Sequence, residues 1–394
     1  MTEKQWAQLN AVRRQIHRHP ETSWEEFETT RYIRSILSQI EGVEIAELGL
    51  KTGVVASLKG SKPGECVALR ADIDAIDVVE RWPSSCMSEA EGKGHLCGHD
   101  FHTAALLGVA MLLSEQRDRL HGEVVFVFQP AEETTDGAQY VIEHGLFERF
   151  GIKGIFGLHN RPEVETGKVV VHTGPLMAAK VNFSVVVHGV GGHGSMPHRC
   201  VDPIVCAAAI VQAVLTIPSR NVDPMSSLVL SICSIHGGTP KNLIVDHVEM
   251  TGSMRYHDAE VGRRAMTRLR TVIEATAASF ECQAEFRVDA EVDAVVHTPQ
   301  MASIARRVAV RIFGEDSVID AMPCMATEDF SAYLRHVPGF FYWVGCRKPD
   351  EAVYAWHNDM FHVDEDALPY ASRLLSESAV VFLETSCEQA PHTF

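Results

Sequence analysis

Short apolar runs alternate with polar segments along the chain, and four of these runs lead into Asp, Glu or His. They cover residues 66–69, 124–128, 154–158 and 340–344. Continuous apolar runs of this length, bounded by turn residues such as Gly122 and Pro130, predict strands that are buried on both faces. Open α/β sheets bind ligands outside the carboxyl ends of their strands. We therefore expect the polar residues after the four runs to share one rim of a single sheet.

A different pattern begins after Gly174 and Pro175, and it predicts a second, smaller domain. Asp202 followed by Pro203 is typical of an N-cap and the first position of a helix. The expected elements are a strand at 181–188, a helix at 204–217, strands at 227–236 and 247–256, a helix after Asp258 and a strand at 282–292. This order, βαββαβ, predicts a ferredoxin-like two-layer sandwich. The apolar face expected for its second helix contains Val261, Ala265, Leu269, Val272 and Ala275.

The C-terminal part of the chain is expected to return to the first domain. It supplies a helix at 301–313, the apolar run at 340–344 and a helix at 368–384. His357 would complete a ligand set begun by residues near 97, 133 and 159, which requires both flanks to form one body. We expect a catalytic α/β domain over 1–178 and 293–394, with 179–292 inserted as a lid or dimerisation domain.

Composition and charge narrow the class of protein. The chain has 394 residues, 46% hydrophobic and 22% charged, which is ordinary for a soluble globular protein. Its formal net charge of −17 would repel phosphate backbones, so we expect no nucleic-acid partner. The N-terminus lacks a signal-peptide pattern, and no apolar stretch is expected to approach membrane-spanning length, so we expect no membrane partner and a cytoplasmic location. The 10 scattered cysteines favour free thiols over a disulfide framework.

The candidate chemistry lies in two motifs about thirty residues apart. Cys97 and His99 are two positions apart, and Glu132 and Glu133 follow the strand expected at 124–128. Thiolate, imidazole and carboxylate groups are metal ligands, and one of the two carboxylates is a candidate for proton transfer beside them. A Cys-x-His pair occurs often by chance, and adjacent Glu residues usually form a solvated surface. Their placement at strand ends favours a metal-dependent hydrolase.

Seven motifs in order resemble the dinuclear metal aminoacylase and carboxypeptidase family, within it the hippurate hydrolases and indole-acetyl-amino-acid hydrolases. The motifs lie at 17–21, 69–75, 97–102, 129–133, 157–159, 191–198 and 328–330. The resemblance implies a zinc-exopeptidase-like mixed sheet flanked by helices, with the inserted sandwich as a lid. It also implies Glu132 as general base, His193 as the group that polarises the scissile carbonyl, often from a partner subunit, and five metal ligands: Cys97, His99, Glu133, His159 and His357.

Further site residues follow from the resemblance. Asp74 matches an acidic position behind the ligands, and Asn242 and Arg255 match residues of the lid that contact substrate. Arg255 is equally suited to an ion pair with Asp258. Asp100 and His102 are expected to orient ligands, His17 to pack in a helix, and Asp329 either to start a helix at Phe330 or to act in catalysis. Relatives often carry an apolar or aromatic residue where this chain has 160–162, which indicates a changed pocket wall.

The implied activity is hydrolysis of N-acyl amino acids of the N-acetyl or N-benzoyl type. It implies two divalent ions per chain, Zn²⁺ first, with Mn²⁺, Co²⁺ or Ni²⁺ as alternatives, and a homodimer or higher homo-oligomer. A dipeptidase or carboxypeptidase on the same scaffold is the second hypothesis. A binding protein that keeps the fold without catalysis is the third, and the intact ligand set with Glu132 argues against it.

Overall fold

The apolar runs form the strands of two separate sheets in the computed structural model, which describes residues 1–238, 241–320 and 322–389. Unit 1 comprises Met1–Gly174, Val296–Met322 and Asp329–Phe394, and unit 2 comprises Pro175–Val295 and Pro323–Glu328. These divisions lie a few residues from the expected boundaries at 178–179 and 292–293. The segment Pro323–Glu328 groups with unit 2, whereas the sequence places it in the flanking domain.

The sheet of unit 1 is mixed, and its central strands are parallel. β3 pairs in parallel with β4 and β5, and β5 pairs in parallel with β16. The strands in spatial order are β1 (Val43–Ala46), β2 (Val54–Lys59), β4 (His121–Gln129), β3 (Lys62–Asp72), β5 (Gly154–Glu165), β16 (Gly339–Arg347), β6 (Val169–Val170) and β15 (Val318–Ile319). Because the four central strands are parallel, their carboxyl ends meet at one edge. The single polar rim expected from the apolar runs is confirmed.

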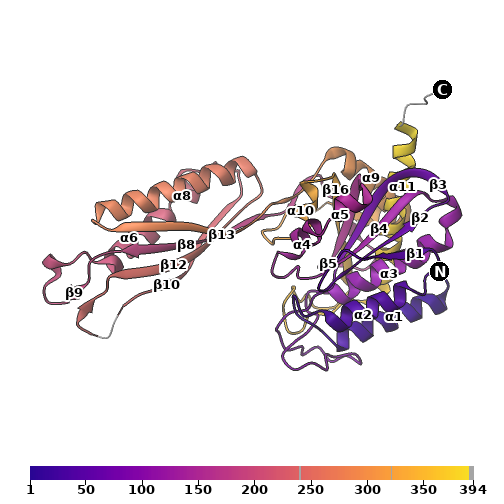
Figure 1. Cartoon of the computed structure of the whole chain (residues 1–394), viewed down its shortest axis with the longest axis horizontal. Helices are drawn as coiled ribbons and strands as arrows, with labels where there is room; N and C mark the ends of the chain where they lie inside the picture. The colour runs from indigo at the N-terminus through magenta and orange to yellow at the C-terminus, as the bar shows by residue number, and fades with distance from the viewer. Residues whose placement is uncertain (239–240, 321, 390–394) are drawn as a thin grey trace. The chain divides into compact units, whose positions relative to one another are not determined.

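Helices flank the sheet of unit 1, and the main core lies between them and the strands. α3 packs against α1, α11 and β3, and Figure 1 shows α1 beside α3. Alternate side chains of β4, such as Phe126 and Phe128, join this core. The helices are α1 (Glu3–Arg18), α2 (Phe27–Leu37), α3 (His99–Glu115), α4 (Gly137–Glu143), α5 (Leu146–Phe150), α9 (Pro299–Phe313), α10 (Ser331–Leu334) and α11 (Leu368–Gln389), with 3₁₀ turns at Arg117–Arg119, Glu315–Ser317 and Glu365–Ala367. The mixed sheet flanked by helices is the predicted fold.

Unit 2 has the predicted order βαββαβ. Its sheet runs β10, β12, β8, β13 with every neighbouring pair antiparallel, and α6 and α8 pack together on it. The elements are β8 (Ala179–His188), α6 (Pro203–Val214), α7 (Ile217–Arg220), β10 (Leu228–His236), β12 (His247–Tyr256), α8 (Ala259–Ser279) and β13 (Gln283–Val292), with a small ladder of β9 (Gly192–His193) and β11 (Leu243–Ile244), a 3₁₀ turn at Pro197–Arg199, and β7 (Gly174–Met177) and β14 (Val295–His297) at the ends of the insertion. The ferredoxin-like prediction is confirmed.

The helices of unit 2 begin where their caps predict. The Asp202 side chain accepts hydrogen bonds from the backbone of residues 204 and 205, and Asp258 caps α8 in the same way. The buried face of α8 differs from the expected one: it contains Gly262, Ile273 and Ala277 in place of Val261, Val272 and Ala275. From Ala265 the buried positions follow steps of four residues, and because each such step exceeds the 3.6 residues of one turn, the buried stripe winds slowly around α8.

The stretch Pro203–Arg220 corrects the expectation about apolar length. Its mean hydropathy of 1.5 over 18 residues reaches the level of a membrane span by length and composition, and 33% of it is buried. The structure divides this stretch into α6 and α7, with Pro218 in the second helix. The buried side of α6 joins the core of unit 2 through Cys206, Ala207, Ile210 and Val214. A single stretch of this kind is weak evidence for membrane insertion.

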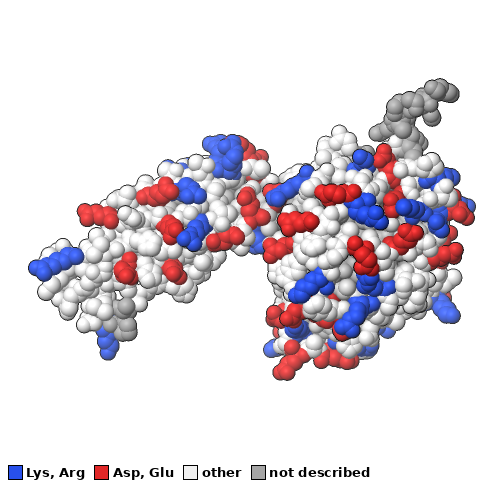
Figure 2. Space-filling view, in the orientation of Figure 1, with Lys and Arg blue, Asp and Glu red and all other residues white. Residues whose placement is uncertain are grey.

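Charged side chains of both signs mingle on the visible faces of the units. Figure 2 shows acidic groups beside basic ones over most of this surface. On the visible face, acidic side chains therefore do not gather in a single patch.

A buried ion cluster joins α1 to the start of α3. Asp100 Oδ2 lies 2.6 Å from Arg13 Nε and 2.9 Å from His17 Nδ1. The other ring nitrogen of His17 lies 3.1 Å from Glu80 Oε1. His17 therefore does more than the helix packing expected of it: it bridges two buried carboxylates.

His17 is predicted to make stability depend on pH. Burial opposes its protonation most strongly, but the charge of Asp100 and the hydrogen bonds to Asp100 and Glu80 together outweigh burial and raise the pKa of His17 from 6.5 to about 9. Because the folded-state pKa is the higher one, this contribution is complete below about pH 6.5 and is lost as the pH rises through about 9. A shift of this size corresponds to roughly 3 kcal/mol of free energy of unfolding.

Urea unfolding of the wild type and His17→Gln from about pH 6 to about pH 10 would measure this contribution. Gln keeps hydrogen-bonding groups but cannot take a proton, so the difference in stability should shrink as the pH rises. A difference that stays constant over this range would mean that His17 is neutral in the folded protein.

Candidate metal centre

The turn before α3 delivers two of the predicted ligands. Cys97 precedes the helix and His99 is its first residue, with Gly98 between them at φ +91°. A Cβ at this position would lie 2.2 Å from Asn160 Nδ2. Glycine is therefore required here both by the left-handed backbone and by the close approach of the amide.

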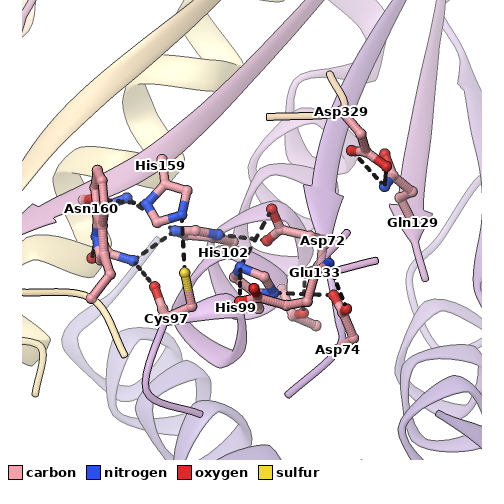
Figure 3. A network of polar contacts seen from close by, with 12 residues as sticks. Asp72, Asp74, Cys97, His99, His102, Gln129, Glu133, His159, Asn160 and Asp329 are labelled. Carbon is pink, nitrogen blue, oxygen red and sulfur yellow. Dashed lines mark hydrogen bonds and ion pairs between the residues drawn. The ribbon is translucent and has the colours of Figure 1, made fainter. Parts of the chain in front are cut away.

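The five predicted ligands come together at the carboxyl edge of the sheet of unit 1. Cys97 Sγ lies 3.4 Å from His159 Nε2, and Glu133 Oε1 lies 3.3 Å from His357 Nε2 and 3.8 Å from His99 Nε2. Figure 3 shows Cys97, His99, Glu133 and His159 around a common space. In three overlapping groups the ligand atoms lie within 4.8 Å of one another: Cys97, His99 and His159; Cys97, Glu133 and His357; and His99, Glu132 and Glu133.

Two of the histidines are oriented by contacts behind the site. His99 Nδ1 lies 3.1 Å from Asp74 Oδ1, and His159 Nδ1 lies 2.8 Å from its neighbour's backbone oxygen, Asn160 O. Each ring therefore presents Nε2 to the cluster. A histidine that ligates a metal commonly donates its other N–H to a carboxylate or a backbone carbonyl in this way.

The donor set fits a pair of divalent cations. Within the described chain, His99 Nε2 and Glu133 Oε1 are buried and have no hydrogen-bond partner. Buried polar atoms rarely stay unpaired, and a cation between them satisfies both. The set combines sulfur, nitrogen and oxygen donors, which suits zinc and other transition metals.

Electrostatics in the cluster also favour a cation. Burial opposes a charge on His99, but Asp72, Asp74 and Glu133 outweigh burial and raise the pKa of His99 to about 10. Burial and the neighbouring carboxylates Glu133 and Glu132 raise the pKa of the Cys97 thiol well above its ordinary value. Excess negative charge surrounds the ligand atoms, and a divalent ion would balance it.

Glu132 and Glu133 are held by the turn that follows β4. Ala131 has φ +53°, and its N–H donates to the buried Glu26 carboxylate at 2.8 Å. The N–H of Glu133 donates to Asp74 Oδ2 at 3.0 Å. Asp74 therefore orients both His99 and the Glu133 backbone. Glu132 is 6% exposed and lies beside the ligands, where a carboxylate is suited to proton transfer.

His102 has no nitrogen left for a metal. Its Nδ1 lies 2.6 Å from Asp72 Oδ1, and its Nε2 accepts from Asn160 N at 3.0 Å. The group formed by Asp72, His99 and His102 is therefore a hydrogen-bonded support rather than a metal site. Asp100 differs from the expectation that it orients a ligand, because its side chain contacts Arg13 and His17 of α1.

Arg70 holds Asp72, and with it the hydrogen-bonded support formed by Asp72, His99 and His102. Its guanidinium donates to Asp72 Oδ2 at 2.7 Å, to Gln129 Oε1 at 2.8 Å and to Asp329 Oδ1 at 2.7 Å, and all four side chains are buried. Asp329 also accepts from Gln129 Nε2 and from Ala138 N. The helix-capping interpretation of Asp329 is wrong, because α10 has Phe330 at its N-cap with no side-chain cap.

Sequence reasoning missed Asp72, Asn160, Glu26 and the roles of Arg70 and Gln129. Asp72 and Gln129 lie at the ends of the strands that predicted the rim, so their positions carried a signal. For Asn160 the signal was its place directly after His159.

The three remaining site residues lie in unit 2. His193 is exposed in β9, and its Nδ1 accepts from Ser195 N at 3.1 Å. Asn242 is exposed, and its backbone oxygen accepts from Gly194 N. Arg255 in β12 donates to Met325 O at 2.6 Å and to Thr327 Oγ1 at 3.1 Å. The ion pair with Asp258 does not form, because Asp258 caps α8.

Relatives in sequence cover almost the whole chain. N-acetylcysteine deacetylase of Bacillus subtilis (strain 168) is 40% identical over 375 residues, 95% of this chain and 96% of that protein. Thermostable carboxypeptidase 1 of Saccharolobus solfataricus is 36% identical over 377 residues, 94% of each chain. IAA-amino acid hydrolase ILR1-like 2 of Arabidopsis thaliana is 33% identical over 377 residues, 95% of this chain and 84% of that protein.

A solved structure shares both fold and sequence with this chain. The Bacillus subtilis YXEP protein, described as a dinuclear metal binding peptidase from the M20 family, matches with a TM-score of 0.86 and 36% identity. The match covers 98% of this chain and 100% of that one. The family description Peptidase family M20/M25/M40 matches residues 68–380. The predicted resemblance and the prediction of a hydrolase are confirmed: the chain belongs to peptidase family M20/M25/M40.

Proposed function

We propose that this protein hydrolyses the amide bond of N-acyl amino acids. Glu132 would be the general base. Five side chains would hold two divalent ions: Cys97, His99, Glu133, His159 and His357. The observation that carries the proposal is that the donor atoms of these side chains form groups in which all atoms lie within 4.8 Å of one another, beside the buried Glu132 carboxylate. The deacetylase and amino acid hydrolase among the relatives support this substrate class.

The chain's own residues divide the reaction between them. Divalent ions held here would lower the pKa of a bound water and polarise the scissile carbonyl. Glu132 takes the proton of the attacking water on its carboxylate and delivers it to the leaving amine. Asp74 keeps His99 and the backbone of Glu133 in place during the reaction.

Unit 2 is proposed to supply substrate contacts. His193 would stabilise the oxyanion that forms at the scissile carbonyl, and Asn242 and Arg255 would bind the substrate. The guanidinium of Arg255 matches the free carboxylate of an N-acyl amino acid. The proposed assembly is a homodimer in which His193 serves the site of the partner subunit.

A carboxypeptidase or dipeptidase is the second proposal, and the relative named thermostable carboxypeptidase 1 favours it. Both reactions use the same ligands and base, so a substrate panel must separate them. N-acetyl, N-benzoyl and N-lauroyl amino acids and a set of dipeptides should be compared with Zn²⁺, Mn²⁺, Co²⁺ and Ni²⁺. Preference for dipeptides over every N-acyl amino acid would overturn the first proposal.

The two adjacent carboxylates should respond differently to substitution. Glu132→Gln should keep its metal and lose on the order of a hundredfold in kcat, the range for a removed general base. Glu133→Gln should lose metal affinity, because an amide oxygen is a weaker ligand than a carboxylate. Elemental analysis and turnover of both variants test this pair. Equal loss of metal in the two variants would show that the roles are assigned wrongly.

Metal content is predicted to reach two ions per chain. Removal of metal by a chelator should abolish hydrolysis of the best N-acyl amino acid, and added divalent ions should restore it. Mixed donors do not select one ion decisively, so several ions should restore activity to different extents. Full activity of a protein that elemental analysis finds free of metal would contradict the proposal.

Mixing two inactive variants tests the role of His193. In a dimer that shares sites, His193→Ala and Glu132→Gln chains together form one site with both residues intact. About a quarter of the wild-type activity is then expected from an equal mixture after full exchange, since half of the dimers are mixed and each has one intact site. No recovery despite proven subunit exchange would place His193 in its own chain's site or outside catalysis.

A further inference from the structure

Asn160 is a fully buried residue next to the ligand His159, and all of its polar groups have partners. Its side-chain Nδ2 donates to Cys97 O at 2.6 Å and lies 2.9 Å from His102 Nε2. Its Oδ1 accepts from Trp356 Nε1 at 3.2 Å and from Cys346 Sγ at 3.7 Å. An amide has two donor hydrogens and two acceptor lone pairs, so its hydrogen-bonding capacity is used completely.

These partners fix the orientation of the amide. Cys97 O can only accept a hydrogen bond, and Trp356 Nε1 can only donate one. A flipped amide would place two oxygens 2.6 Å apart at Cys97 and two N–H groups against each other at Trp356. Figure 3 shows the Asn160 amide directed at Cys97 and His102.

The amide connects three segments that carry proposed ligands. Asn160 itself follows His159 in β5, Cys97 lies in the turn before α3, and Trp356 directly precedes His357. The backbone of Asn160 strengthens the connection, because its oxygen accepts from both His159 Nδ1 and Trp356 Nε1. Asn160 therefore hydrogen-bonds to both the Cys97 and the Trp356 segments.

The segment that carries His357 needs such a connection. His357 is exposed and has a left-handed backbone with φ +66°, an uncommon conformation for a residue with a side chain. Besides the approach of its ring to Glu133, its N–H donates to Leu96 O at 2.8 Å, and the preceding Trp356 is bound to Asn160. The contacts of Leu96 and Asn160 both lead to the segment of Cys97, so the positions of two ligands depend on each other.

We propose that Asn160 is a positioning residue for the metal centre, which sets the distance between the Cys97 and His357 ligand segments by bonding to both. The inference rests on the ligand set of the proposed function. It assigns to Asn160 a role in metal affinity that is separate from its contribution to folding. Loss of an outer partner of this kind usually weakens metal binding by about ten- to a hundredfold.

Asn160→Asp tests the proposal with almost no change in shape. The carboxylate can still accept from Trp356, but it cannot donate to Cys97 O or His102. We expect the dissociation constant for Co²⁺, measured by competition with a chromophoric chelator, to rise by about ten- to a hundredfold. Trp356→Phe, which keeps an aromatic ring but loses the indole N–H along with part of the ring system, should raise it by roughly tenfold.

Tyr342→Phe is the matched control. Tyr342 is fully buried in β16, and its hydroxyl hydrogen-bonds to Ser378 at 2.9 Å, away from the ligand segments. Its loss should lower the melting temperature of the chelator-treated protein and leave Co²⁺ affinity unchanged. Measuring the melting temperature of every chelator-treated variant separates weakened folding from weakened metal binding.

Co²⁺ affinity within twofold of wild type in Asn160→Asp, or an equal loss in Tyr342→Phe, would overturn the proposal. If Asn160→Asp does not fold, Trp356→Phe decides, and unchanged affinity in that variant would overturn it. A wild-type protein that binds Co²⁺ but hydrolyses no N-acyl amino acid would refute the proposed function and leave this inference standing. A wild type that binds no Co²⁺ would refute the ligand set and the inference with it.

Discussion

The buried guanidinium of Arg70 is the interaction on which the metal centre depends. It bonds two carboxylates and one amide in the interior of unit 1: Asp72, Asp329 and Gln129. Removing one partner of a buried charge pair typically costs about 3–5 kcal/mol, because the remaining charge stays buried without compensation. The cluster therefore fixes the carboxyl ends of β3 and β4 together, at the edge where the proposed ligands lie.

Hydrogen bonds of defined direction connect this cluster to the proposed ligands. Asp72 bonds the guanidinium on one oxygen and His102 Nδ1 on the other. His102 is thereby held with Nε2 as an acceptor, and Asn160 donates to that nitrogen. Asp74 acts in parallel on His99. A metal centre with mixed donors gains little selectivity from ligand type alone, so the geometry imposed by these supports matters more.

Much of the fold and part of the site follow from local sequence patterns. Short apolar runs predict the buried strands, and the rule for parallel strand ends places Glu133 and His159 at one edge. The contacts of Arg70 could not be predicted in this way, since Asp329 is 259 positions away along the chain. The packing of distant segments decides which partner a buried charge contacts, and local sequence patterns do not predict that packing.

The failures of local reasoning have physical causes that concentrate at the site. Asp329 is a residue type typical of a helix N-cap, but the buried guanidinium of Arg70 binds its carboxylate more strongly than a free backbone N–H would. Asp100 stands in the first turn of α3, yet it bonds Arg13 and His17 of α1.

The backbone also has uncommon conformations at the site, as it does at some other positions. Ala131 and His357 both have positive φ, and each is held by a hydrogen bond from its own N–H, to Glu26 and to Leu96 O. Strained conformations of this kind persist where the surroundings determine them, and they occur mostly at functional sites. Both residues adjoin or supply the proposed chemistry: Ala131 precedes Glu132, and His357 is itself a proposed ligand. The strain is therefore part of the cost of directing the Glu132 and His357 side chains toward one site. The ion cluster of Arg70 and the amide of Asn160 hold the segments that make this arrangement possible.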